Sequence, residues 1–98
     1  MAYFQVLFQG KGIRLPFDGG DSAIGFFTTR VVRADSSDDA LDRARDVVLS
    51  EWRDGGSYAA VNSGEVPELV ADPIRRLGPL RGFFGRKRTG YVFYCHED

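Results

Sequence analysis

The sequence predicts an α+β fold in which one principal helix covers a mostly antiparallel sheet of about four strands, in a two-layer sandwich. Two segments near the start of the chain alternate apolar and polar residues, as β-strands do. A capped, amphipathic segment over residues 36–52 has the apolar spacing of a helix. Two further apolar segments follow it, so the expected order is strand, strand, helix, strand, strand.

The first two strands are expected at Tyr3–Ile13 and Ile24–Ala34. In the first, Phe4, Val6 and Phe8 fall on one face, and the glycines at positions 10 and 12 weaken or bend its far end. In the second, alternation separates Phe27, Thr29 and Val31 from a second set on the other face: Phe26, Thr28, Arg30 and Val32. The loop between the two strands is rich in proline, glycine and aspartate, and a hairpin is the simplest connection.

The helix is expected to begin at Ser36 or Ser37, because a serine oxygen can accept a hydrogen bond from a free N–H group of the first turn. Two aspartates then occupy the first turn, where the helix dipole favours negative charge. Gly55-Gly56 supplies the stop. The apolar stripe that should face the sheet consists of Ala40, Leu41, Ala44, Val47, Val48 and Trp52.

The C-terminal half predicts a third strand at Glu68–Leu77 and a last strand at Tyr91–His96. Pro73 cannot donate to a sheet ladder, so it favours an edge or a bulge in the third strand. We therefore expect two hairpins that are joined through the helix. This order resembles a ferredoxin-like domain that lacks one helix.

Length and composition limit the class of protein. The 98 residues predict a single domain over 1–98, and a net charge of −1 excludes a globally basic nucleic-acid binder. A single cysteine, Cys95, cannot form an internal disulfide. The absence of a leader-like segment and of a run of about 20 apolar residues favours a cytoplasmic protein without a membrane span. The compact, arginine- and aspartate-rich composition is typical of a small bacterial protein.

One helix covers only one face of the sheet, yet both faces carry large apolar groups. Phe27, Val31, Tyr91 and Phe93 are therefore candidates for an interface, although alternation alone does not show which set faces the helix. Three occupants of the second face are open: the loops at 56–67 and 78–90, a second copy of the chain, or a flat ligand such as stacked bases.

Residues 73–90 contain six basic residues and no acidic one, which makes this segment a candidate for binding an anionic partner. Cations neutralise phosphates, and the neighbouring phenylalanines at 83 and 84 could stack on bases. The alternative is a solvated hairpin loop with one phenylalanine in the core. The candidate residues are Arg75, Arg76, Arg81, Arg86, Lys87 and Arg88.

Catalytic and metal-binding patterns are weak. Cys95 and His96 are neighbours in an expected strand, so they should point to opposite faces and not share a metal ion or a reaction. Asp38, Asp42 and Asp46 lie on the solvated face of the helix. We therefore expect that the protein is not an enzyme and that it binds neither a cofactor nor a metal ion. The sequence favours a small non-enzymatic interaction domain that self-associates through its sheet, with an anionic-ligand, nucleic-acid or acidic-protein binder as the alternative.

Overall fold

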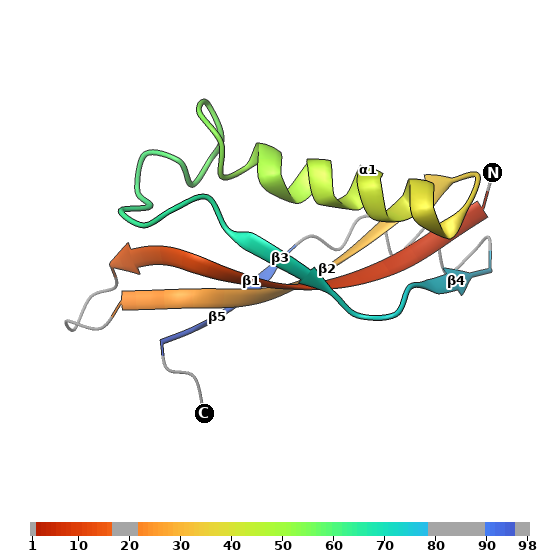
Figure 1. Cartoon of the computed structure of the whole chain (residues 1–98), viewed down its shortest axis with the longest axis horizontal. Helices are drawn as coiled ribbons and strands as arrows, with labels where there is room; N and C mark the ends of the chain where they lie inside the picture. Colours follow the sequence, from red (N-terminus) through yellow and green to blue (C-terminus); the bar gives the residue numbers. More distant parts are fainter. Residues whose placement is uncertain (1, 17–21, 79–89, 96–98) are drawn as a thin grey trace.

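The computed structural model describes residues 2–16, 22–78 and 90–95. It is an α+β fold with one helix and a five-stranded antiparallel sheet. The elements are β1 (Ala2–Pro16), β2 (Ser22–Ala34), α1 (Ser37–Ser50), β3 (Glu68–Ala71), β4 (Arg75–Leu77) and β5 (Tyr91–Tyr94). The helix runs along one face of the sheet (Figure 1), as the amphipathic pattern predicts.

The long strands β1 and β2 form the expected hairpin, pairing from Ala2 opposite Ala34 to Lys11 opposite Gly25. The register shifts between Lys11 and Leu15, where Gly12 has a φ of +92°. A positive φ suits glycine. The irregularity lies at the end of the strand where the two glycines were expected to weaken or bend it.

The third expected strand is divided around Pro73. β3 pairs with residues 8–11 of β1, and β4 pairs with residues 3–5 of the same strand. The prediction of an edge or bulge at Pro73 is confirmed, because residues 72–74 interrupt the strand on one edge of the sheet.

The expectation of a second hairpin is wrong. β5 pairs antiparallel with β2, at the opposite edge from β3 and β4, which gives the order β3-β1-β2-β5 with β4 also on β1. The apolar character of residues 91–94 predicts a strand but does not show which strand it pairs with. Both the preceding strand and β2 were possible partners. The described pairings show an antiparallel sheet with one helix, and they do not confirm the ferredoxin-like topology.

The first of the two candidate serines is the N-cap of helix α1. The Ser36 Oγ accepts a hydrogen bond from the Asp39 N–H at 3.1 Å, and Ser36 has extended backbone angles, as an N-cap residue does. The helix ends at Ser50, so Trp52 lies in the turn that follows rather than in the last helical turn. Its ring is nevertheless 2% exposed and joins the core.

The core lies between the helix and the sheet. Its buried side chains come from alternate positions of β1 and β2, from the sheet-facing stripe of the helix and from Trp52. They include Val6, Phe8, Ile13, Leu15, Ala23, Phe26, Ala44, Val48 and Trp52. The face of β2 that carries Phe26 is therefore the covered face, which resolves the question that alternation left open.

Candidate functional site

A cluster of aromatic rings fills the core beneath the end of the helix. Trp52 is stacked between Phe26, at a centroid distance of 5.3 Å, and Tyr58, at 4.7 Å. Tyr91 and Phe93 of β5 contact the same rings edge-on. The two β5 residues proposed as interface candidates from the sequence thus lie on the helix side of the sheet, within the folded core.

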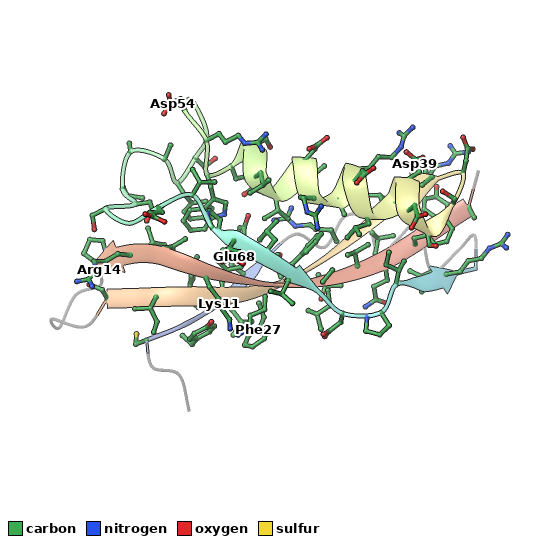
Figure 2. The ribbon with its side chains drawn as sticks, viewed as in Figure 1. Lys11, Arg14, Phe27, Asp39, Asp54 and Glu68 are labelled. Atoms are coloured by element: carbon green, nitrogen blue, oxygen red, sulfur yellow. The ribbon has the colours of Figure 1, made fainter. Side chains whose placement is uncertain are left out.

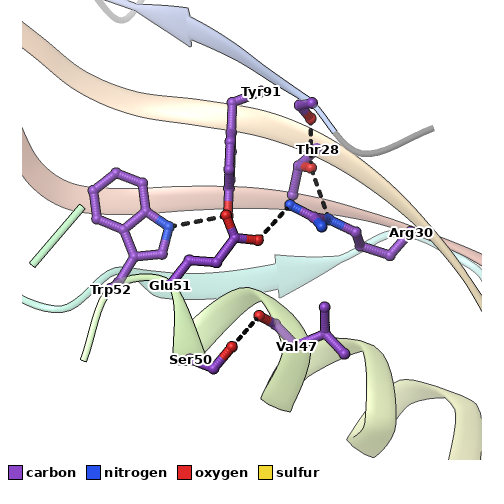
Figure 3. A network of polar contacts seen from close by, with 8 residues as sticks. Thr28, Arg30, Val47, Ser50, Glu51, Trp52 and Tyr91 are labelled. Atoms are coloured by element: carbon purple, nitrogen blue, oxygen red, sulfur yellow. Dashed lines mark hydrogen bonds and ion pairs between the residues drawn. The ribbon is translucent and has the colours of Figure 1, made fainter. Parts of the chain in front are cut away.

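A polar network adjoins this cluster (Figure 3). Arg30 is 4% exposed, and its guanidinium donates to the Glu51 carboxylate at 2.9 Å and to the Thr28 Oγ at 3.3 Å. Thr28 in turn donates to the Gly90 carbonyl at 2.7 Å. On an uncovered face, Arg30 could bind an external carboxylate or phosphate. Its face is covered, and Glu51 at the end of the helix provides the carboxylate.

Tyr91 completes the network. Its hydroxyl accepts a hydrogen bond from the Trp52 Nε1 at 3.2 Å, and its ring lies 5.2 Å below the guanidinium carbon of Arg30. Burial raises the pKa of Tyr91 to about 12. The hydrogen bond from Trp52 opposes this shift, and the negative charge of Glu51 adds to it. The phenol therefore stays protonated at neutral pH. The network fastens β5 and the helix end to β2 and offers no poised base.

The opposite face of the sheet, which we call the open face, carries Leu7 of β1, Phe27 and Val31 of β2, and Val92 and Tyr94 of β5. Phe27 projects away from the helix (Figure 2) and is 42% exposed, and Val92 is 69% exposed. Of the four sequence candidates, Phe27 and Val31 lie here while Tyr91 and Phe93 do not, because neighbouring strand residues alternate between faces.

The open face is apolar and uncharged at its centre. Between its apolar side chains lie Gln5, Gln9 and Thr29, which are polar but carry no charge. Among the described side chains the charges lie at its margins, on Lys11, Arg33 and Glu68. In a chain with 28% charged residues, this arrangement resembles the centre of a protein interface, where charged residues are depleted.

Tyr94 is held in place on the open face. A Cβ atom at Gly25 would come within 2.3 Å of the Tyr94 ring, so the ring lies directly over the bare backbone of that glycine. The Gln9 side chain donates to the Tyr94 hydroxyl at 3.1 Å, and Phe27 contacts the ring at a centroid distance of 5.5 Å. This arrangement was not predicted from the sequence, although a glycine within an apolar strand is a signal of close backbone approach.

A shallow hollow of about 620 Å³ lies beside these rings. Leu7, Phe27 and Val92 line its apolar part, with Thr28, Thr29, Gly90 and Tyr91 completing it. Its volume is within the range of small-molecule pockets, but it is open rather than enclosed, and none of its described lining residues is charged. Such a hollow beside projecting side chains suits apolar contact with another protein surface better than the orientation of a reacting group.

The basic segment is mostly outside the described residues. Arg81, Arg86, Lys87 and Arg88 fall there, and for Arg75 the structure places the backbone of β4 alone. Arg76 is exposed on β4, opposite Phe4 of β1. The proposal of an anionic partner therefore stays a prediction from the sequence.

Residues 2–16, 22–78 and 90–95 contain no group of three or more His, Cys, Asp or Glu side chains that could hold a metal ion. Cys95 is a free, partly buried thiol, and His96 falls outside these ranges. No helix in the same ranges is long and apolar enough to cross a membrane.

Comparison with known proteins adds no relative to this picture. No protein-family model matches the chain, and neither the curated proteins nor the solved structures contain a significant match.

Proposed function

We propose that this chain is a small non-enzymatic interaction domain that forms a homodimer through the open face of its sheet. The observation that carries the proposal is the uncharged apolar centre of that face, where Phe27 and Val92 are 42% and 69% exposed. Exposed apolar patches of this kind, bordered by polar residues, are typical of protein interfaces.

A second copy is the partner that fits best. In a two-fold dimer each surface meets itself, so a charged centre would place like charges opposite each other. The described side chains of the open face avoid this repulsion, because the charged ones among them lie at the margins. It also offers both projecting side chains, Val92 and Phe27, and a hollow beside them that can receive the same side chains from the second copy.

The area of the open face indicates how tightly two copies should associate. β1 from Tyr3 to Lys11 spans about 27 Å, and four strand positions span about 19 Å, which gives about 500 Å² per copy. The two copies together would bury about 1,000 Å², near the lower limit for a specific interface. We therefore expect a reversible dimer with a dissociation constant in the micromolar range rather than an obligate one.

The test replaces Phe27 by glutamate and measures mass by sedimentation across a concentration series. Phe27→Glu is expected to fold, because Phe27 is 42% exposed in the single chain. It is expected to break the open-face contact, because the interface would have to bury two carboxylates, one from each copy, without a positive partner. Val61→Glu is the matched control, since Val61 is 55% exposed but lies in the turn after the helix. Equal masses for the wild type and both variants would refute the open face as the interface.

A further inference from the structure

The segment that joins the helix to β3 forms a strap over one end of the sheet. It runs from Arg53 to Val66, between two buried residues, Trp52 and Pro67, and none of its own residues, all of which are described, is buried. It passes over the end of β1 on the helix side of the sheet (Figure 1), away from the open face. A segment with so few buried contacts opens more readily than the core beside it.

Tyr58 attaches the strap to the core. Its ring is stacked on Trp52 at a centroid distance of 4.7 Å and meets Tyr91 edge-on at 5.2 Å. Its N–H donates to the Glu51 carbonyl at 2.8 Å, at the end of the helix. Because the other face of Trp52 lies on Phe26, the Tyr58 ring is what covers the remaining face of the indole.

Asn62 attaches the strap to β1. Its Oδ1 accepts hydrogen bonds from two N–H groups, that of Arg14 in β1 at 2.9 Å and that of Gly64 in the strap at 3.0 Å. Its Nδ2 donates to the Glu65 carbonyl at 2.9 Å. One amide side chain therefore shapes the turn at residues 62–65 and fastens that turn to the strand.

Backbone contacts between the strap and β1 depend on this turn. The Ser63 N–H donates to the Arg14 carbonyl, and the Glu65 N–H donates to the Gly12 carbonyl, both at 2.9 Å. The two segments lie so close that a Cβ atom at Gly64 would come within 2.6 Å of the Gly12 carbonyl oxygen. The strap thus continues the pairing of β1 beyond the residues that pair with β3.

We propose that the strap, residues 53–66, opens and closes as one unit on the folded domain, and that Asn62 is its latch. The helix and the β1–β2 hairpin stay folded when it opens, because the buried side chains of the core do not come from the strap. Opening removes Tyr58 from the face of Trp52 and frees the Arg14 N–H and C=O groups. The strap therefore controls access to the aromatic cluster.

Hydrogen exchange of the wild-type chain tests whether the strap is a unit. The Tyr58, Ser63 and Glu65 amides, which bond to the rest of the fold, should show similar protection after correction for their intrinsic rates. Their exchange should be at least tenfold less protected than that of the β1–β2 ladder. It should hardly change with added urea below the unfolding transition, because opening the strap exposes little surface.

Three variants test the latch, each at a different contact. Asn62→Ala removes the three side-chain hydrogen bonds, Gly64→Ala brings a methyl group against the Gly12 carbonyl, and Tyr58→Ala removes the stacked ring. Each should speed exchange of the strap amides by about tenfold or more, and by the same factor at both attachment points. Ser57→Ala, at an exposed position of the same strap, is the control and should change none of them.

Two results would overturn the proposal. If the wild-type strap amides exchange as slowly as the ladder and with the same dependence on urea, they exchange only when the whole domain unfolds. If Asn62→Ala speeds the Ser63 and Glu65 amides but leaves the Tyr58 amide unchanged, the two attachment points open independently and Asn62 is not the latch of the strap.

Discussion

Replacing Glu51 should reveal how much the fold depends on the buried polar network. Arg30 has a side-chain exposure of 5%, and Glu51, its ion-pair partner at 2.9 Å, has 27%. Removing one partner of a fully buried pair costs about 3–5 kcal/mol, because the remaining charge is left without compensation. Water can reach the Glu51 side of this pair, so we reduce that figure to about 2 kcal/mol for Glu51→Leu.

The partner variant and the double variant complete a thermodynamic cycle. Arg30→Met leaves Glu51 free to turn toward solvent, and we expect a loss of about 1 kcal/mol. The double variant removes both charges and should lose no more than the Arg30→Met variant, which gives a coupling free energy of about 2 kcal/mol. An additive double variant would mean that the ion pair contributes nothing, and the account of Arg30 as the anchor of the helix end would be wrong.

Urea unfolding followed by fluorescence is the assay. Trp52 is the single tryptophan of the chain, and it is buried beside the network, so its emission reports directly on this region. The dependence of the unfolding free energy on urea concentration should stay constant among the variants, since none of them changes the surface exposed on unfolding by much. A changed slope would indicate a loosened native state rather than a lost interaction.

Three further predictions concern single positions. Ser36→Ala should lower the free energy of unfolding by about 1 kcal/mol through loss of the N-cap, whereas Ser37→Ala should change it little, and equal losses would contradict the assigned cap. Gly10→Ala should cost about 1–3 kcal/mol, because its Cβ would come within 2.2 Å of the buried Phe26 ring, and a neutral result in thermal unfolding would refute that contact. Tyr91 has a folded pKa of about 12 against an ordinary value of 10.0, so its contribution to stability is complete below pH 10 and is lost as pH rises toward 12. Tyr91→Phe should remove that alkaline decline in urea unfolding measured from pH 9 to 12, and an unchanged decline would assign it to other groups.

Local sequence signals predicted the helix and its start, and placed its end two residues too late. The serine cap, the two aspartates of the first turn and the apolar stripe all act within a few residues, and all are visible in the chain itself. Pro73 likewise predicted the interruption between β3 and β4, since its missing N–H group is a local property.

The orientation of the sheet could not be predicted in the same way. Phe26 and Phe27 are equally apolar, and alternation shows that they oppose each other without showing which is covered. Trp52 decides it, because its ring stacks on Phe26 from beyond the end of the helix. That contact joins positions 26 residues apart, and the local sequence pattern of neither segment predicts it.

The partner of β5 was missed for a related reason. Hairpins are the commonest arrangement of successive strands, but here the Thr28 hydroxyl holds the Gly90 carbonyl and Phe93 lies opposite Phe26 in the β2 ladder. Aromatic contacts with the Trp52 cluster are satisfied at this edge and not at the edge occupied by β4. The placement of Tyr91 and Phe93 in the core follows from that pairing.

The mass of the wild-type chain in solution tests the central claim most directly. Sedimentation equilibrium over a wide concentration range, at low and at moderate salt, should give at least twice the monomer mass at high concentration. Because the open face is uncharged at its centre, moderate salt should not reduce the dimer to monomer. A chain that stays monomeric at high concentration in both buffers would contradict the claim that the open face is an interface.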